Sequence, residues 1–406
     1  MILRTDISME GQVQTPSGNV DTSFCMDMAF HIFLKEAEEA SNFVFSPFSF
    51  HCMLSLIAVG STGSTLEQLL SFLKLKSIDE LKNLASQAIT SVLFPSNWSE
   101  DQSGSPIVSF VNGAWVDRSF CLKPSFQEMV KGVYGATAKE VDFVNEANQV
   151  LNDINTWVET ETRGIIKNLL PSKCLGGDTA LVLANALCFK GTWDRKFDAS
   201  KTKYNDFHLL GGQIVQVPFM TSKRYQRHLY GCFDGYKILK IPYKNDQDAR
   251  QFSMHFFLPE ATDGLHSLIQ VFKSSPELYA TQFKLQEEDL PEFWIPRFKF
   301  SFKFEDSKTM KEMGLELPFK AVGELSEMVD SAKSLFLSNV FHASCIEVNE
   351  EGTEAAASTA PRLIRQSRRL NPPSFVADHP FLFLIREEKS GLTFFIGAVI
   401  NPLLVS

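Results

Sequence analysis

The stretch Asn349-Glu350-Glu351-Gly352-Thr353-Glu354-Ala355-Ala356-Ala357-Ser358-Thr359-Ala360-Pro361 follows a strand-like segment that ends at Val348. After it comes a basic stretch, which Asn371-Pro372-Pro373 closes and which contains Arg362, Arg365, Arg368 and Arg369. Together they predict a loop of roughly twenty-five residues, and loops of that length in a globular chain are usually functional or disordered. At this point a functional loop and a disordered tether are both open.

The two halves of this loop have different physical uses. Small side chains from Gly352 to Ala360 offer no bulk that would obstruct the passage of the segment between other strands. The arginines that follow carry the charge that a trypsin-like specificity pocket binds. The combination favours a protease bait attached to an insertable strand over a mere tether.

Composition limits the class of protein. The chain has 406 residues, 44% of them apolar, and its 36 phenylalanines predict an aromatic interior with a large β component. The formal net charge of -9 argues against a protein that tracks nucleic-acid phosphates. The longest apolar runs, Thr179 to Phe189 and Leu392 to Ile400, are too short to span a membrane and are predicted to be buried strands.

The N-terminus and the cysteines indicate the compartment. Residues 1–20 form a polar extension that lacks the apolar block of a signal peptide, so we expect a cytoplasmic protein, although release from the cell stays open. The seven cysteines are odd in number, scattered and never in Cys-x-x-Cys spacing. This pattern is typical of reduced, mostly buried thiols.

Periodicity along the chain predicts one mixed α and β domain. Helical spacing indicates one helix from about Ser49 to Val59 and another through Val150 to Val158, which Gly164 ends. Phenylalanine alternates with polar residues from Arg297 to Phe304, as in a strand with one buried face. A hairpin at Gly211-Gly212 and a strand over Phe252–Leu258 are also predicted. No internal repeat is visible.

Catalytic motifs are missing from the sequence. It contains no Gly-x-Ser-x-Gly elbow, phosphate loop, His-Glu-x-x-His or Gly-x-Gly-x-x-Gly, and its eight histidines never have metal-ligand spacing. We therefore expect neither a cofactor nor a metal, and no enzyme activity. Asp378-His379 suggests acid-base chemistry, but the apolar run that follows favours the start of a buried strand.

Beyond the loop, several longer segments resemble those of one protein family, the serpins. The sequences of these segments are most similar to the plant branch of the family, the cereal Z-type serpins. The hinge-like stretch Asn349 to Ala360 is one of them, and the match extends in order over most of the chain. The other matching segments are Phe43–Ser49, Asn155–Ile166, Asn185–Trp193, Phe375–Phe381 and Phe395–Pro402.

The resemblance implies an α+β fold with three β-sheets, about nine helices and an exposed reactive centre loop near the C-terminus. Residues 1–406 would form a single, monomeric domain, in which 349–374 are the hinge and the loop. It also implies suicide inhibition: the target protease cleaves the loop, forms an acyl-enzyme and is carried away as the loop inserts into the central sheet.

The resemblance assigns the hinge to nine residues. They keep the family's run of small residues intact, which favours an inhibitor over a non-inhibitory member. These are Glu350, Glu351, Gly352, Thr353, Glu354, Ala355, Ala356, Ala357 and Ser358. Counting seventeen residues from Glu350 places the reactive bond at Gln366-Ser367, and Arg365-Gln366 is the alternative for an Arg-preferring enzyme. Insertion of Thr353 through Gln366 would carry the protease roughly 46 Å.

The resemblance also implies a polar cluster that controls the opening of the main sheet, made of Ser46, Ser49, Asn185 and His342. Asn185 lies within an apolar run, and a buried amide needs hydrogen-bond partners, so such a cluster is physically sensible. Each of the four could also be an ordinary satisfied polar residue. Trp193 would mark the top of the sheet, where insertion begins.

Two functions from different classes stay open. The first is a covalent trap for a trypsin-like serine protease or an Arg-specific cysteine protease. The second is a non-inhibitory binding, storage or chaperone-like protein on the same fold. Pro361 departs from the expected pattern, because proline removes a backbone donor from the strand that should insert. It puts the efficiency of trapping in doubt.

Overall fold

The computed structural model describes residues 23–83, 106–222, 226–245, 250–274, 283–305, 307–352 and 372–404. The predicted N-terminal extension, residues 1–20, lies outside these ranges. So do Thr353 to Ser358 of the predicted hinge, Pro361 and both candidate reactive bonds. The hinge residues up to Gly352 are described.

Three β-sheets organise the described chain, which confirms the predicted α+β class. The central sheet has the order β12-β13-β4-β2-β3, with bounds Phe298–Glu305, Asn339–Val348, Leu181–Lys190, Ile107–Asp117 and Thr137–Val141. A seven-stranded sheet has the order β1-β16-β15-β9-β8-β7-β10, with bounds Phe43–Phe45, Thr393–Val399, Phe381–Glu387, Phe252–Pro259, Tyr236–Pro242, Arg227–Phe233 and Gln286–Asp289. The third has the order β14-β11-β6-β5, with bounds Ser374–Val376, Glu292–Pro296, Ile214–Met220 and Lys203–His208.

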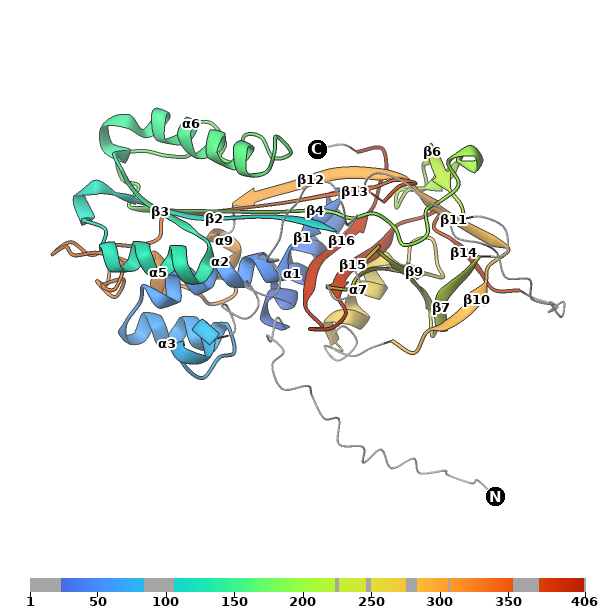
Figure 1. Ribbon diagram of the computed structural model, residues 1–406, viewed down its shortest axis with the longest axis horizontal. Helices are drawn as coiled ribbons and strands as arrows, with labels where there is room; N and C mark the ends of the chain where they lie inside the picture. Colours follow the sequence, from blue (N-terminus) through green and yellow to red (C-terminus); the bar gives the residue numbers. More distant parts are fainter. Residues whose placement is uncertain are drawn as a thin grey trace, which may run out of the picture.

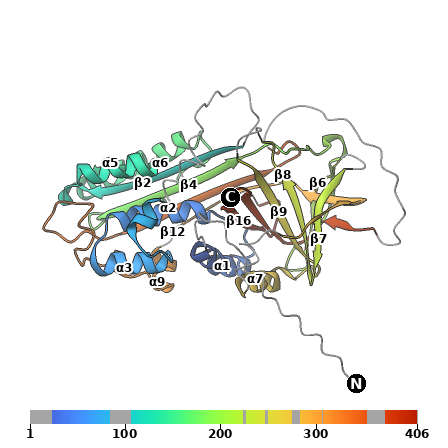
Figure 2. The same ribbon diagram turned by 60° about the horizontal axis from the view of Figure 1, so that its bottom comes forward.

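The helices cover the sheets from several sides (Figures 1 and 2). The described α-helices include α1 Ser23–Glu38, α2 Pro47–Val59, α3 Gly63–Phe72, α5 Pro124–Tyr134, α6 Phe143–Glu161, α7 Leu265–Ser274 and α9 Ser307–Glu312. Short 3-10 helices occupy Arg118–Phe120, Ala199–Lys201 and Leu317–Phe319. No helix in the described ranges is long and apolar enough to cross a membrane.

The inner strands of the central sheet are largely buried on both faces, whereas the edge strands β12 and β3 carry exposed residues. Figure 1 shows α6 along one face and α2 on the opposite side. In β4, Val182, Ala184 and Ala186 pack into the cluster that contains the buried residues of α6, whereas Leu183 and Leu187 pack into the main core with α2. Odd-numbered residues of β4 therefore face α2, and even-numbered residues face α6, as the two-residue period of a strand requires.

Phenylalanine rings join the central sheet to the seven-stranded sheet. The alternating strand that the sequence predicted is β12, and its Phe298 ring lies 5.8 Å from the ring of Phe383 in β15. Phe302 likewise lies 5.0 Å from Phe43 in β1. The abundance of phenylalanine thus reflects a core built between two sheets, where rings in edge and offset contact bury much apolar area.

The other predicted elements are found, with one shifted boundary. The hairpin that turns at Gly212 joins β5 to β6, the strand from Phe252 is β9, and both long apolar runs are the buried strands β4 and β16. The helix predicted from Ser49 begins earlier, at Pro47. Proline fits the first helical position because that N–H needs no partner, and the side chain of Ser46 caps the helix.

Candidate functional site

The hinge leaves the end of β13 in a tight turn. An antiparallel bridge pairs Asn349 with Gly352, and the Gly352 N–H donates to the Asn349 carbonyl over 3.2 Å. The Asn349 side-chain oxygen accepts from the Glu351 N–H over 3.0 Å. The turn therefore ends at Gly352, which is the last described residue before the predicted loop.

Gly352 is required by the close approach of another segment. Its φ is +86°, in the left-handed region that favours glycine. A Cβ atom built at this position would lie 2.4 Å from the Trp193 backbone nitrogen and 2.5 Å from the Gly191 carbonyl oxygen. Any other residue would therefore push the hinge away from the chain segment that follows β4.

That segment binds the hinge through backbone and indole hydrogen bonds. The Trp193 N–H donates to the Glu351 carbonyl over 3.2 Å, and the Phe197 N–H donates to the Glu350 carbonyl over 3.0 Å. The indole Nε1–H of Trp193 donates to the Asn349 carbonyl over 2.9 Å. Trp193 is 1% exposed and stacks on Tyr243, with ring centroids 4.4 Å apart, so the position from which it holds the hinge is rigid.

Charged and polar side chains hold the two hinge glutamates. The nearly buried Glu350 carboxylate accepts from the Thr202 hydroxyl over 2.5 Å and lies 3.5 Å from Arg297 Nε. The Glu351 carboxylate pairs with Lys196 Nζ over 2.5 Å. These contacts fix the start of the loop while leaving Gly352 as the point from which it departs.

Below the hinge, the parallel pairing of β4 with β13 ends before either strand does. The last paired residues of these two strands are Cys188 in β4 and Cys345 in β13. β13 stays paired with β12 as far as Val348, and β4 stays paired with β2 as far as Lys190. The two strands are thus held by their outer neighbours but part from each other directly beneath the hinge.

Further down the same pair of strands, the four predicted cluster residues lie together, all fully buried. The side-chain oxygen of Asn185 in β4 accepts from the Ser49 hydroxyl over 2.6 Å and lies 2.7 Å from Nδ1 of His342 in β13. The Ser46 hydroxyl accepts from the Ser49 N–H over 3.1 Å at the start of α2. The bond between Asn185 and His342 therefore spans the two strands that part above.

The hydrogen bonds assign the tautomer of His342. The Asn185 oxygen can only accept, so His342 Nδ1 carries the proton, and Nε2 accepts from the Ser344 hydroxyl over 3.0 Å. Burial lowers the pKa of His342 to about 3, because the interior disfavours the charged ring. His342 is therefore a neutral link between β13 and Asn185, with both ring nitrogens engaged.

The free energy of unfolding should fall as the pH drops below about 6.5. An unfolded histidine takes up a proton near that pH, whereas folded His342 stays neutral until about pH 3. The contribution of His342 to the free energy of unfolding is therefore complete above pH 6.5. It is lost as the pH falls toward 3, at up to about 1.4 kcal/mol per pH unit. Urea titrations from pH 4.5 to 7.5 give the free energy of unfolding at each pH. A plot of this free energy against pH should have a shallower slope for His342→Asn than for the parent.

The matched control for this prediction is His31→Asn, which changes an exposed histidine of α1. Because an exposed side chain is not taken out of water on folding, this variant should change the slope less than His342→Asn does. His255 and His228, whose pKa values burial lowers to about 3 and about 4, keep part of the slope in every variant. Identical slopes for His342→Asn and the parent would show that folded His342 binds its proton as an unfolded histidine does.

Some members of the site were not predicted from the sequence. Ser344 joins the polar cluster, and a period of two from His342 along a strand could have identified it. Lys196 and Thr202, both in the connection between β4 and β5, and Arg297 from a distant segment anchor the hinge glutamates. No local pattern in the sequence connects these three residues to Glu350 and Glu351.

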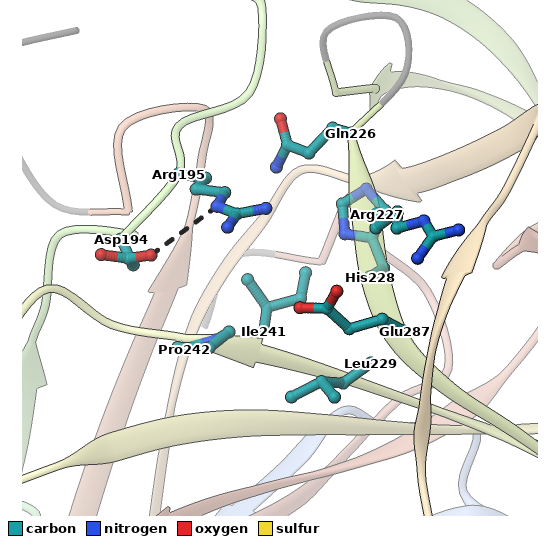
Figure 3. Close-up of a pocket in the computed structure, with 9 residues that line it drawn as sticks. All are labelled: Asp194, Arg195, Gln226, Arg227, His228, Leu229, Ile241, Pro242 and Glu287. Atoms are coloured by element: carbon teal, nitrogen blue, oxygen red, sulfur yellow. Dashed lines mark ion pairs between the residues drawn. The ribbon is translucent and has the colours of Figure 1, made fainter. Parts of the chain in front are cut away.

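A small pocket lies beside the segment that holds the hinge (Figure 3). Its volume is about 90 Å³, and Asp194, Arg195 and His228 are among its lining residues. Burial and the nearby Arg195 lower the pKa of His228, and its ring stacks on Phe293 with centroids 4.1 Å apart. The pocket is smaller than the several hundred Å³ of a typical ligand site.

Asp378 and His379 have a structural role. His379 Nδ1 lies 2.7 Å from the Asp378 carboxylate, and Nε2 lies 2.8 Å from the Pro259 carbonyl. Both ring nitrogens of the buried imidazole are therefore engaged just before β15 begins. This agrees with the interpretation of the pair as the start of a buried strand.

The described cysteines are free thiols, but the expectation that most are buried is wrong. Cys52 and Cys188 are buried, and Cys174 and Cys345 are half-buried. Cys121 and Cys232 are exposed. Cys121 directly follows a 3-10 helix, and Cys232 lies on β7 near the end of the seven-stranded sheet, positions that the scattered spacing could not reveal.

Comparisons with known proteins agree with this architecture. The family model described as Serpin (serine protease inhibitor) matches residues 19–402. Serpin-ZX of Arabidopsis thaliana is 42% identical over 408 residues, covering 99% of this chain and 100% of that protein. Serpin-ZXA of Oryza sativa subsp. japonica is 46% identical over 368 residues, covering 90% of this chain and 91% of that protein.

A solved structure shows the same fold. Arabidopsis AtSerpin1 in its native stressed conformation superposes with a TM-score of 0.85 at 42% identity, covering 94% of this chain and 97% of that one. The resemblance to the plant branch is thereby confirmed. The family match over nearly the whole chain and the plant relatives at 42% and 46% identity show that this chain belongs to the serpin family.

Proposed function

We propose that this protein is a suicide inhibitor of proteases and not an enzyme. A target protease would cleave a bond in the loop that follows Gly352. It would form an acyl-enzyme with the new C-terminal end of the N-terminal part of the loop. The loop would then insert between β4 and β13 and displace the protease before deacylation. Trapping succeeds when insertion is faster than hydrolysis of the acyl bond.

The arrangement at the end of β13 is the observation that carries this proposal. β13 runs parallel to β4, and the two strands part beneath the turn that Asn349 and Gly352 close. A strand that continued from Gly352 would run antiparallel to both neighbours. Antiparallel pairing is somewhat more stable per residue than the parallel pairing that it would replace, so insertion is downhill.

Under this proposal, the polar cluster holds β4 and β13 together and so keeps the central sheet closed. Asn185 and His342 join the strands that must separate, and Ser49 holds Asn185 from α2. Ser46 supports Ser49 by capping the helix. Trp193 marks the entry, since its indole and backbone hold Asn349 and Glu351 at the mouth of the gap.

We further propose that the target prefers arginine, as trypsin-like serine proteases and Arg-specific cysteine proteases do. Arg362, Arg365, Arg368 and Arg369 all follow the hinge. Guanidinium groups bind the acidic specificity pockets of such enzymes with paired hydrogen bonds. We expect the protein to act as a monomer in the cytoplasm.

A protease panel tests this function directly. Incubation with a stoichiometric amount of a trypsin-like or Arg-specific cysteine protease should yield a covalent complex that survives SDS electrophoresis. Cleavage of the loop by every such enzyme without any complex would contradict the trap and support a non-inhibitory binding role. A partly trapped, partly cleaved population would indicate that Pro361 slows insertion, because it removes a donor from the inserting strand.

The bond that the protease attacks should be Gln366-Ser367 for most targets and Arg365-Gln366 for an Arg-specific enzyme. Only a cut near the end of the insertable stretch gives the displacement its full reach. Mass spectrometry of the C-terminal peptide released from a denatured complex identifies the bond. A peptide that begins at Ser367 or Gln366 supports the assignment, whereas one that begins at Arg369 or Leu370 overturns it.

A further inference from the structure

Two cysteines face each other across the strands that the loop must separate. Cys188 in β4 and Cys345 in β13 are Cα partners, and they form the last pair before the strands part. Cys188 belongs to the apolar cluster that contains the buried face of α6, and Cys345 packs against the same cluster. Both side chains therefore lie on the same face of the sheet.

Their geometry suits a disulfide. Neighbouring strands are about 4.7–4.9 Å apart. A disulfide requires a Cα separation of about 4.4–6.8 Å. Burial raises the pKa of the Cys188 thiol well above its usual range, and the neighbouring Cys345 thiol adds to this effect, as expected for side chains of paired residues on one face of the sheet.

Cys174 is the third cysteine that packs against this cluster. It lies in the connection between α6 and β4, outside the two strands that the loop must separate. A bond from Cys174 would therefore not join β4 to β13.

We propose that Cys188 and Cys345 form a reversible disulfide that fastens the central sheet against loop insertion, which makes them a redox modification site. The oxidant would be a low-molecular-weight disulfide of the glutathione type. The thiolate of the more accessible Cys345 attacks one sulfur of the oxidant and releases one thiolate. Cys188 then attacks the Cys345 sulfur and releases the second, so that two electrons reduce the oxidant to two thiols and two protons leave the protein.

The disulfide and the inserted loop exclude each other. An inserted strand would place β4 and β13 two strand spacings apart, about 9.5 Å, which no disulfide spans. Continuing the pairing that Asn349 and Gly352 begin would put Ala356 opposite Cys345. Only Thr353 to Ala355 could therefore enter before the inserting strand reached the disulfide.

The block to loop insertion rests on the proposed function, whereas the formation of the disulfide between Cys188 and Cys345 does not. The chemistry is tested by equilibrating the uncleaved protein with oxidised glutathione and digesting it without reduction. Mass spectrometry should find a peptide pair joined through Cys188 and Cys345, about 2 Da lighter than the two free peptides, that dithiothreitol separates. The same treatment after loop cleavage should give no joined pair. Absence of the pair from the uncleaved protein would overturn the proposal.

The consequence is tested with the same samples and an Arg-preferring protease. Oxidation should lower the yield of SDS-stable complex at least about tenfold while cleavage persists, and dithiothreitol should restore the yield. Cys345→Ser should trap equally well with and without oxidant, and Cys188→Ala provides a second variant if that one folds poorly. Cys121→Ser, which removes an exposed thiol, should behave as the parent.

The outcomes separate the two proposals. A reduced parent protein that forms the joined peptide on oxidation but never forms a complex would contradict the proposed function and leave the redox site standing. A reduced parent that traps a protease, and traps it equally well once the disulfide is complete, would overturn the claim that the disulfide blocks insertion.

Discussion

Under the proposed function, replacing Thr353 with arginine should make the protein a substrate of its target protease in place of an inhibitor. Thr353 is the first residue after the Gly352 turn, and in the inserted strand its side chain would point inward beneath the sheet. A buried arginine without a partner costs several kcal/mol. If about 3 kcal/mol of that cost appears in the barrier to insertion, insertion slows more than about a hundredfold, and deacylation becomes the faster step.

The matched control is Glu354→Arg, at the next position. Side chains alternate between the two faces of a strand, so this arginine would point outward and stay solvated. Electrophoresis of each variant with the protease should show cleaved protein without complex for Thr353→Arg, and complex for Glu354→Arg. Equal complex yields from Thr353→Arg and the parent would mean that the hinge does not begin to insert at this residue.

Local patterns predicted those parts of the fold that local physics determines. The alternation of phenylalanine with polar residues predicted β12, and the apolar run around Asn185 predicted β4, because a strand repeats every two residues. The start of α2 was predicted at Ser49, two residues later than the helix begins. Proline is accepted at the first position of a helix, and the cap by Ser46 becomes visible only when its hydroxyl meets the Ser49 N–H.

The site residues were predicted from the family resemblance more than from physical patterns. The contacts that hold the hinge in place come from residues that are distant from it in the sequence. The hinge motif includes Gly352, but the reason for a glycine is the backbone of Trp193, about 160 residues earlier in the chain. The partners of Glu350, Thr202 and Arg297, come from different segments that only the folded chain brings together. The pairing of Cys188 with Cys345 likewise depends on the register of two strands.

Cleavage of the loop should raise the melting temperature sharply. The cut end would become a strand of about fourteen residues, from Thr353 to Gln366, between β4 and β13. With about one backbone hydrogen bond per residue, each contributing about 0.5–1.5 kcal/mol net, the gain is about 10 kcal/mol. For a chain of this size that corresponds to a rise of about 10 °C or more, which a disordered tether would not produce.

The control for this experiment is Thr353→Arg cleaved in the same way, which should melt close to its uncleaved form because its loop cannot enter. Dithiothreitol in all samples keeps Cys188 and Cys345 reduced, so that no disulfide blocks the gap. Mass spectrometry should verify that cleavage lies within Arg362 to Arg369.

The most direct test of loop insertion is therefore differential scanning calorimetry of the parent protein before and after limited trypsin treatment. A melting temperature that is higher by about 10 °C or more after cleavage is the result that insertion predicts. An unchanged melting temperature after verified cleavage of the loop would contradict it.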